Sequence, residues 1–307
     1  MTDTIQSEKN LRKAVFLGLL AGLLILPMFS YMQFTFTATT PELKQKAYDI
    51  LVNYRIPLHS LPEIWLTRGG AKVQCILPLL ALILVRKTRL FLLILVPYIF
   101  AVVLTILQIL IHNDFLAFIA PWRMSVFLVP LSTAVILGWI ISHLLTQKQD
   151  TIWIKRLVTG LSLMTISVLV VVGANKQVEL LNYEGDSTPL LEFVRLNKQP
   201  EDLYLIPPDY KDLQKFRLYT GAPIFINRKS HPYKDIEVIA WYNRVETALS
   251  IYQNNDCSRL KEIISEVKIT HAVAQNEQHS LNCKFLEAIY QDNLYKVYKI
   301  QAIAADS

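Results

Sequence analysis

The chain has 307 residues, a formal net charge of +6 and a mean hydropathy of +0.32, and 52% of its residues are hydrophobic. Soluble domains contain about 45–50% apolar residues, so the total excludes little, but nearly all long apolar runs precede residue 175. The sequence contains no Gly-rich phosphate loop, no Gly-x-Ser-x-Gly elbow and no His/Cys cluster with metal-ligand spacing. These absences exclude P-loop, α/β-hydrolase and zinc-site signatures as guides to function.

Five stretches are apolar enough to cross a bilayer, which takes about 20 residues. They are residues 14–34, 71–85, 90–111, 125–145 and 157–174. The second is short, but Lys72 can extend to the interface and Trp65 can anchor the segment before it. The first is too long for the apolar region of a cleaved signal peptide and lacks a small-x-small cleavage site. The pattern predicts an α-helical transmembrane bundle of about five spans.

Lysine and arginine residues set the expected orientation, because cytoplasmic loops are enriched in them. Three segments fall on one side if there are five spans, and they hold Lys9, Arg12 and Lys13; Arg86, Lys87 and Arg89; and Lys148, Lys155 and Arg156. The opposite short loop has only Arg123. We therefore expect a cytoplasmic N-terminus and an extracytoplasmic C-terminal part, on which side nucleic acid is not an expected partner.

This orientation divides the chain into three expected parts: a cytoplasmic tail (1–13), a transmembrane domain (14–174) and an extracytoplasmic domain (175–307). The transmembrane domain includes an outer loop, residues 35–70. There, Thr40 is a plausible N-cap with Pro41 at the first helical position. Apolar residues recur on one face after them, at Leu43, Ala47, Ile50, Leu51 and Tyr54. We expect an amphipathic helix on the outer membrane surface or on neighbouring spans.

The extracytoplasmic part alternates strand and helix patterns. Strands are predicted at 202–208, 223–227 and 270–275, helices at 209–221, 236–253 and 257–267, and a hairpin at 285–300. Alternation of this kind predicts an α/β domain with a mostly parallel sheet and an added antiparallel edge.

Two cysteines of this part are candidates for a disulfide. Cys257 begins a predicted helix, and Cys283 follows the strand after that helix, which runs back toward the helix start. An oxidising compartment allows the bond. The alternative is two free thiols.

A basic segment, "FINRKSHPYKD", follows the second predicted strand and contains Lys229 and His231. Ligands of open parallel sheets bind beyond the carboxyl ends of strands, so Arg217, Lys229 and Arg244 are candidates for one anion site. The alternative is that both arginines pair with acidic residues and Trp241 packs in the core. Nearer the membrane, Arg55 with His59, and Arg123, offer cations for phosphate; the alternatives are a structural loop and an interfacial anchor.

Three segments, "YRIPLHSLPEIW", "FRLYTGAPIFINRKSHPY" and "VIAWYNRV", carry a family resemblance. Over about residues 35–307 the chain resembles the C-terminal half of a bacterial polytopic membrane protein family of unassigned function, which in turn resembles the GT-C class of glycosyltransferases. The matching positions are Arg55, Pro57, His59, Phe216, Arg217, Lys229, Pro232, Tyr233, Trp241 and Arg244. The chain departs from the pattern at Leu58, where the family has a histidine, and at Ala240, where it often has an acidic residue.

The resemblance implies a bacterial inner-membrane location and a polyprenyl-phosphate-linked sugar as ligand. It also implies a carboxylate base, often with a divalent cation. Asp114, beside His112 at a span end, is the best candidate for that base; the alternative is a solvated loop residue. GT-C enzymes have eight or more spans, so we expect a split, truncated or partner-dependent version. The function implied is glycosyl transfer with lipid-linked sugars, and the alternative is a non-catalytic membrane subunit whose outer domain binds a partner or glycan.

Overall fold

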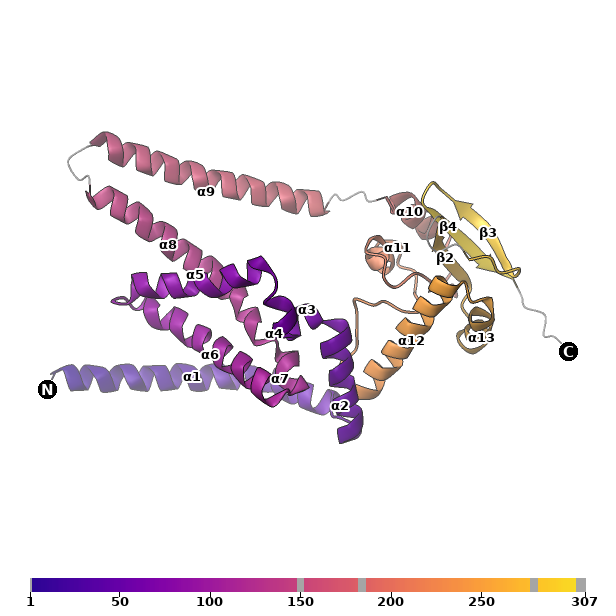
Figure 1. Ribbon diagram of the computed structural model, residues 1–307, viewed down its shortest axis with the longest axis horizontal. Coiled ribbons are helices and arrows are strands. Elements are labelled where there is room, and N and C mark those ends of the chain that lie inside the picture. Colours follow the sequence, from indigo (N-terminus) through magenta and orange to yellow (C-terminus); the bar gives the residue numbers. More distant parts are fainter. Residues whose placement is uncertain (1, 148–151, 182–185, 277–280, 302–307) are drawn as a thin grey trace.

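The structure is a computed structural model and describes residues 2–147, 152–181, 186–276 and 281–301 (Figure 1). Long apolar helices fill one end of the molecule and a small sheet with its helices fills the other. The long helices are α1 (Thr2–Thr35), α5 (Gly69–Val85), α6 (Leu90–Ile111), α8 (Ser125–Gln147) and α9 (Ile152–Leu181). The chain is therefore mostly helical.

Four segments of the described residues are long and apolar enough to cross a membrane. They are Val15–Thr35, Leu90–Ile111, Asp114–His143 and Arg156–Glu179. The predicted second span, α5, has 17 residues, which corresponds to about 25 Å against a hydrocarbon thickness of about 30 Å. The five predicted spans thus become four helices of spanning length and one shorter apolar helix. These helices make the chain an integral membrane protein; its orientation stays a prediction.

Three of the apolar helices pack together through a small core. Ala81 and Leu82 of α5, Ile94 of α6 and Leu128 of α8 are buried against one another. By contrast, no residue of the apolar segment of α1 is buried. The bundle that positions the candidate site is therefore α5, α6 and α8.

Short helices connect α1 to α5 and α6 to α8. The first connection contains α2 (Pro41–Asp49), the π-helix η1 (Ile50–Arg55), α3 (Pro57–Ser60) and α4 (Pro62–Trp65), and the second contains α7 (Asp114–Ile119) and the 3₁₀ helix η2 (Pro121–Met124). The predicted cap of α2 is confirmed: the Thr40 hydroxyl accepts a hydrogen bond from Leu43 N at 3.2 Å, and Pro41 is the first helical residue.

The C-terminal region folds around a four-stranded sheet. Its elements are α10 (Thr188–Asn197), β1 (Tyr204–Leu205), η3 (Asp212–Lys215), α11 (Phe216–Thr220), α12 (Asp235–Asn254), α13 (Cys257–Val267), β2 (His271–Gln275), β3 (Leu286–Gln291) and β4 (Tyr295–Ile300). The strand order is β1-β2-β4-β3. Only β1 and β2 pair in parallel, and β4 runs antiparallel to both β2 and β3.

The prediction of a mostly parallel sheet is therefore wrong. The segment 223–227, predicted as the second strand, forms only one bridge, between Ile224 and Tyr204. It then leaves the sheet at Asn227, whose side-chain oxygen accepts hydrogen bonds from Lys229 N and Ser230 N at 2.7 and 3.2 Å. Because this turn begins so early, the hairpin β3–β4 supplies most of the sheet.

The helix α2 packs against α12 of the C-terminal region, a contact that the sequence did not predict, and it also contacts α7. Figure 1 shows α2 and α12 meeting at the junction of the two ends. Ala47, Ile50 and Leu51 belong to the same buried cluster as Trp241 and Val245. The loop after α1 is thus part of the core of the C-terminal region.

A disulfide joins the start of α13 to the segment before β3. Cys257 and Cys283 are bonded, with their Cα atoms 5.5 Å apart. Cys75, in α5, is a free thiol. The bond closes a 26-residue separation and holds α13 against the edge of the hairpin.

Candidate functional site

A network of hydrogen bonds fixes the connection that carries Arg55 and His59. The Ser60 hydroxyl is buried and lies 2.9 Å from Val52 O and 2.8 Å from Ile56 O. Gln108, a buried residue of α6, donates to Ser60 O at 2.5 Å. The bundle therefore determines the position of this connection relative to the start of α8.

A cavity of about 600 Å³ lies between this connection and the starts of α5 and α8. Its apolar wall consists of Leu58, Trp65, Ala71, Trp122 and Val126, and its polar groups include His59, Arg68, Gln74, Arg123 and Ser125. The indoles of Trp65 and Trp122 stack, with ring centroids 5.5 Å apart and planes inclined by 8°. The cavity thus combines an apolar wall with two guanidinium groups and an imidazole.

Trp122 contributes an unsatisfied donor to this cavity. Its side chain is 8% exposed, and among the described residues its indole Nε1 has no hydrogen-bond partner. Leaving a buried donor unpaired costs about 1–3 kcal/mol. The apolar wall and the cations Arg68, Arg123 and His59 suit the cavity to an amphiphile with an oxygen-bearing anionic head group.

Beside the cavity, the predicted basic segment, residues 225–235, meets the loop after α1. Arg55 Nη2 donates to Lys229 O at 2.6 Å, across 174 residues of sequence. The Arg228 guanidinium lies over the Tyr54 ring, 4.9 Å from its centroid. We name Arg55, Arg228 and His231 the basic seam, because they line the junction between the loop and the C-terminal region.

Charges in the seam repel one another. Burial lowers the pKa of Arg55, and the Arg228 charge lowers it further. Burial also lowers the pKa of His231; its hydrogen bond with Pro232 opposes this change, whereas the charges of Arg55 and Arg123 reinforce it. The effect of Arg123 on His231 shows that the seam and the cavity are electrostatic neighbours.

Three other predicted site residues have structural contacts. Trp241 is buried, and its Nε1 donates to Asn227 O at 2.9 Å. The exposed Tyr233 ring contacts Phe36 and His231. Arg244 lies 5.9 Å from the Phe225 ring centroid.

Arg217, the remaining predicted arginine, is exposed on α11. No contact given by the described residues joins its side chain to Lys229 or Arg244. The structure therefore does not bring Arg217, Lys229 and Arg244 together as predicted. Instead, the Arg55 side chain lies beside Lys229.

Asp114, the predicted base, lies apart from the cavity. Gln45 Nε2 donates to Asp114 Oδ2 at 2.5 Å, and the two residues border a different hollow, which Glu42 and Asp49 also line. Neither Arg55 nor His59 borders this hollow.

The described residues do not fit the divalent cation that the resemblance implies. Across residues 2–147, 152–181, 186–276 and 281–301, no three His, Cys, Asp or Glu side chains are grouped to hold a metal ion. At Asp114 the direct partner is an amide nitrogen, which is a donor and not a metal ligand. We derive no step through a metal.

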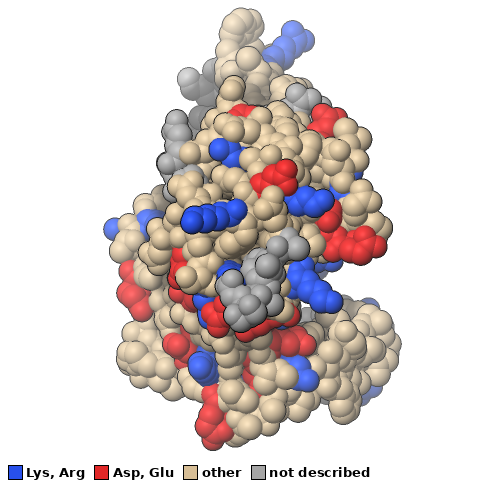
Figure 2. Space-filling view, turned by 90° about the vertical axis from the view of Figure 1, so that its right-hand side faces the viewer, with Lys and Arg blue, Asp and Glu red and all other residues tan. Residues whose placement is uncertain are grey.

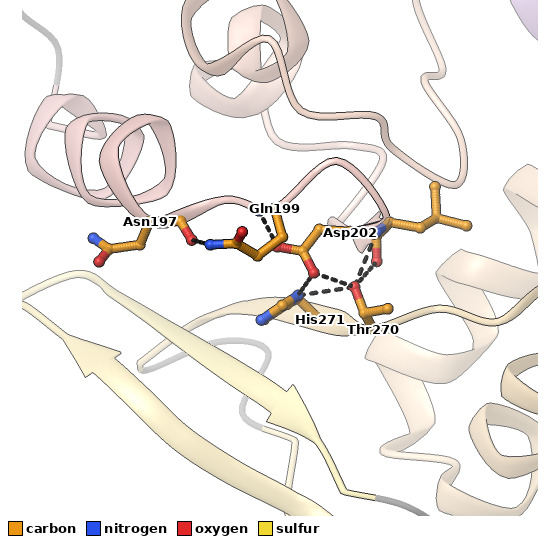
Figure 3. Close-up of polar contacts among 6 residues, drawn as sticks. Asn197, Gln199, Asp202, Thr270 and His271 are labelled. Atoms are coloured by element: carbon orange, nitrogen blue, oxygen red, sulfur yellow. Dashed lines mark hydrogen bonds and ion pairs between the residues drawn. The ribbon is translucent and has the colours of Figure 1, made fainter.

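A second polar cluster, of the buried Asp202 and His271 with the half-buried Thr270, is shown in Figure 3. His271 Nδ1 lies 2.9 Å from the Thr270 hydroxyl and 3.5 Å from Asp202 Oδ1. The same hydroxyl accepts from Leu203 N at 2.9 Å, and the Tyr204 ring stacks on His271. Hydroxyl and carboxylate share one ring nitrogen, so the arrangement is not a nucleophile–base–acid relay; it ties β1 to β2.

The surface at the far end of the C-terminal region is mixed in charge. Figure 2 shows Lys and Arg interspersed with Asp and Glu on that face. Two exposed pairs, Arg195–Glu192 and Arg259–Glu262, belong to this region.

The sequence prediction missed Arg68, Gln74 and Arg228 as members of these sites. Arg68 precedes the paired glycines that begin α5, and an arginine at the end of an apolar helix reads first as an interfacial anchor. The signal for Arg228 is its place in the basic segment, but its neighbour Tyr54 is distant in sequence.

The comparisons with known proteins give one match to part of the chain and indicate no chemistry. Residues 185–248 match a model described as "Domain of unknown function (DUF6798)". No curated protein matches the chain. The matched segment includes Arg228 and His231 of the basic seam and the first part of α12.

Proposed function

We propose that the protein is a membrane-embedded binding protein for a phosphorylated long-chain lipid, whose head group it holds in the cavity between Trp65 and Arg123. The observation that carries the proposal is the cavity itself. Its apolar wall lies where α5 and α8 begin, its cations are Arg68, Arg123 and His59, and the buried Trp122 Nε1 has no partner among the described residues. Guanidinium groups suit phosphate because they present parallel N–H donors.

The resemblance to GT-C glycosyltransferases gives this lipid a chemical class. It implies a polyprenyl phosphate that carries a sugar, in a bacterial inner membrane. The Lys/Arg bias of the loops adds the expected orientation, with residues 175–307 outside and the N-terminus in the cytoplasm. A cavity beside an α/β region at the outer face of the inner membrane suits such a ligand. The chain of the lipid can stay in the bilayer while its sugar faces the C-terminal region. The sugar and its acceptor are outside this proposal.

The role that the geometry favours is binding without transfer. Asp114 borders a different hollow from His59 and Arg123, whereas a general base must come within hydrogen-bond reach of the reacting group. The protein would then present a lipid-linked sugar to a partner membrane subunit that supplies the catalytic carboxylate.

The test of binding uses the purified full chain with farnesyl phosphate and, as the uncharged counterpart, farnesol. Quenching of tryptophan fluorescence reports binding near Trp65 and Trp122. We expect Arg123→Gln to weaken farnesyl phosphate binding about tenfold or more and to leave farnesol unaffected. Arg195→Gln, which alters an exposed ion pair on α10, is the matched control. Equal affinity for phosphate and alcohol in the unaltered protein would refute the proposal.

Surface glycan in living cells separates binding from transfer. If the chain only presents the lipid, Asp114→Asn leaves the glycan unchanged, while Arg123→Gln reduces it. Loss of glycan in Asp114→Asn cells, with farnesyl phosphate binding intact, would establish transfer by this chain instead.

A further inference from the structure

The basic seam contains hydrogen-bond donors that nothing in the described chain satisfies. One guanidinium nitrogen of Arg55 donates to Lys229 O, but the Arg55 Nε is enclosed and has no partner among the described residues. His231 Nδ1 lies 3.0 Å from Pro232 O, a geometry in which Nδ1–H donates to the carbonyl. Its Nε2 then carries a lone pair in the neutral ring and donates to an anion only when the ring is protonated.

The seam is compact because aromatic rings hold its members. Arg228 stacks over Tyr54, and Tyr54 contacts Trp241 at a centroid separation of 6.2 Å. On its other side, Trp241 contacts His231 at 6.1 Å. Tyr54 directly precedes Arg55 in the chain, so three cationic or protonatable side chains surround one aromatic cluster.

No carboxylate balances these charges in the part of the chain that the structure describes. No ion pair joins Arg55, Arg228 or His231 to an acidic residue there. Glu246 of α12 lies close to Tyr54, whose pKa it raises as a hydrogen-bond partner and by its charge, but among the described residues no ion pair joins Glu246 to Arg55, Arg228 or His231. Partly buried like charges destabilise one another unless an opposite charge joins them, which makes the seam an anion site by charge and by donors.

We propose that Arg55, Arg228 and His231 bind a phosphate-class anion, which bridges the loop after α1 and the C-terminal region. Arg55 approaches from η1, and Arg228 and His231 approach from the segment after Asn227. An anion in this position adds donors from both sides to a junction that otherwise depends on Arg55 holding Lys229 O. The site is separate from the lipid cavity and does not depend on the proposed function.

The experiment measures the thermal unfolding midpoint of the purified full chain in detergent, in phosphate and in chloride at equal ionic strength. Phosphate at several times its dissociation constant should raise the midpoint by about 2–4 °C. Arg228→Gln should remove most of this rise, because it deletes one of the proposed anion-binding groups. Arg228 is the residue to change, since it contacts the Tyr54 ring, whereas Arg55 also holds a backbone carbonyl. His231→Gln should reduce it, and Arg195→Gln should leave it unchanged.

A second arm identifies the source of the phosphate. The same variants are compared in nanodiscs of phosphatidylglycerol and of phosphatidylcholine. Stabilisation by phosphatidylglycerol that Arg228→Gln removes assigns the anion to a lipid head group, and stabilisation by inorganic phosphate alone assigns it to a free ion; either outcome supports the site.

Three outcomes would overturn the inference. In the first, phosphate stabilises all four proteins equally. In the second, neither phosphate nor phosphatidylglycerol stabilises the unaltered protein. In the third, Arg228→Gln would also abolish farnesyl phosphate binding, which would make cavity and seam one site. Retained farnesyl phosphate binding in Arg228→Gln, with phosphate stabilisation lost, keeps the two proposals distinct.

Discussion

A few buried polar residues determine how the loop after α1 is attached to the C-terminal region. Asp235, the first residue of α12, is 4% exposed. Its carboxylate accepts from Thr39 N at 2.6 Å, from the Thr39 hydroxyl at 3.0 Å and from Ile236 N at 2.9 Å. Burial alone would raise the pKa of Asp235, but these hydrogen bonds hold it below its usual value.

We predict that Asp235→Asn lowers the free energy of unfolding by about 1–3 kcal/mol, because an amide group replaces an acceptor that serves several donors. Glu237→Gln, two residues along and exposed, is the control and should change stability little. Chemical denaturation monitored by circular dichroism measures both. Asp235→Asn with the stability of the unaltered protein would show that this contact does not hold the loop.

His231 should make stability depend on pH. Its pKa in the folded protein is lowered, so the unfolded chain binds more protons as the pH falls below about 6.5, and the free energy of unfolding decreases there. His271 adds a change of the same sign, because burial also lowers its pKa. We expect the loss of stability between pH 7.5 and pH 5.5 to be smaller in His231→Gln than in the unaltered protein. An identical pH profile would contradict the burial of His231 among cations.

At the scale of elements, periodicity predicted most helices and the final hairpin. The 236–253 and 257–267 patterns correspond to α12 and α13, because an amphipathic face is written locally. The segment 223–227 was mispredicted as a strand, since its local sequence does not reveal that Asn227 turns the chain after one bridge. Placement of α2 on α12 is also a tertiary effect that periodicity cannot specify.

The disulfide between Cys257 and Cys283 should stabilise the C-terminal region. A 26-residue separation corresponds to about 3–4 kcal/mol in the chain-entropy model. We predict that Cys257→Ser lowers the unfolding midpoint, whereas Cys75→Ser does not. Alkylation without reductant, followed by mass spectrometry, should leave Cys257 and Cys283 unmodified. Full alkylation of both would contradict the bond.

For the whole molecule, the short helix α5 decides the topology. Four helices of spanning length place the two ends of the described chain on the same side, and a crossing by α5 places them on opposite sides. We predict a crossing, because Arg86, Lys87 and Arg89 then share a side with Arg12 and Lys13. Cysteines introduced at Arg12 and at Lys211 should be labelled by a thiol reagent added to opposite sides of the membrane. Labelling of both from one side would contradict the crossing by α5.

The seam and the cavity were only partly predictable from the sequence. Arg55, His59, Arg123 and His231 were named as candidates from their chemistry. Their grouping depends on contacts such as Arg55 with Lys229, 174 residues apart, and on the stacking of Trp65 with Trp122. No local pattern encodes such distances, and for the same reason the sequence could not show that Asp114 borders a different hollow from His59 and Arg123.

The central claim is that the cavity holds a phosphorylated lipid. Photo-crosslinking measures this most directly, with a diazirine-bearing farnesyl phosphate, the full chain in nanodiscs and mass spectrometry of the labelled peptides. We predict that labels concentrate in residues 58–74 and 121–126, that excess farnesyl phosphate but not farnesol competes for them, and that Arg123→Gln reduces them. Labels spread along α1 and α9, equally displaced by farnesol, would contradict the claim.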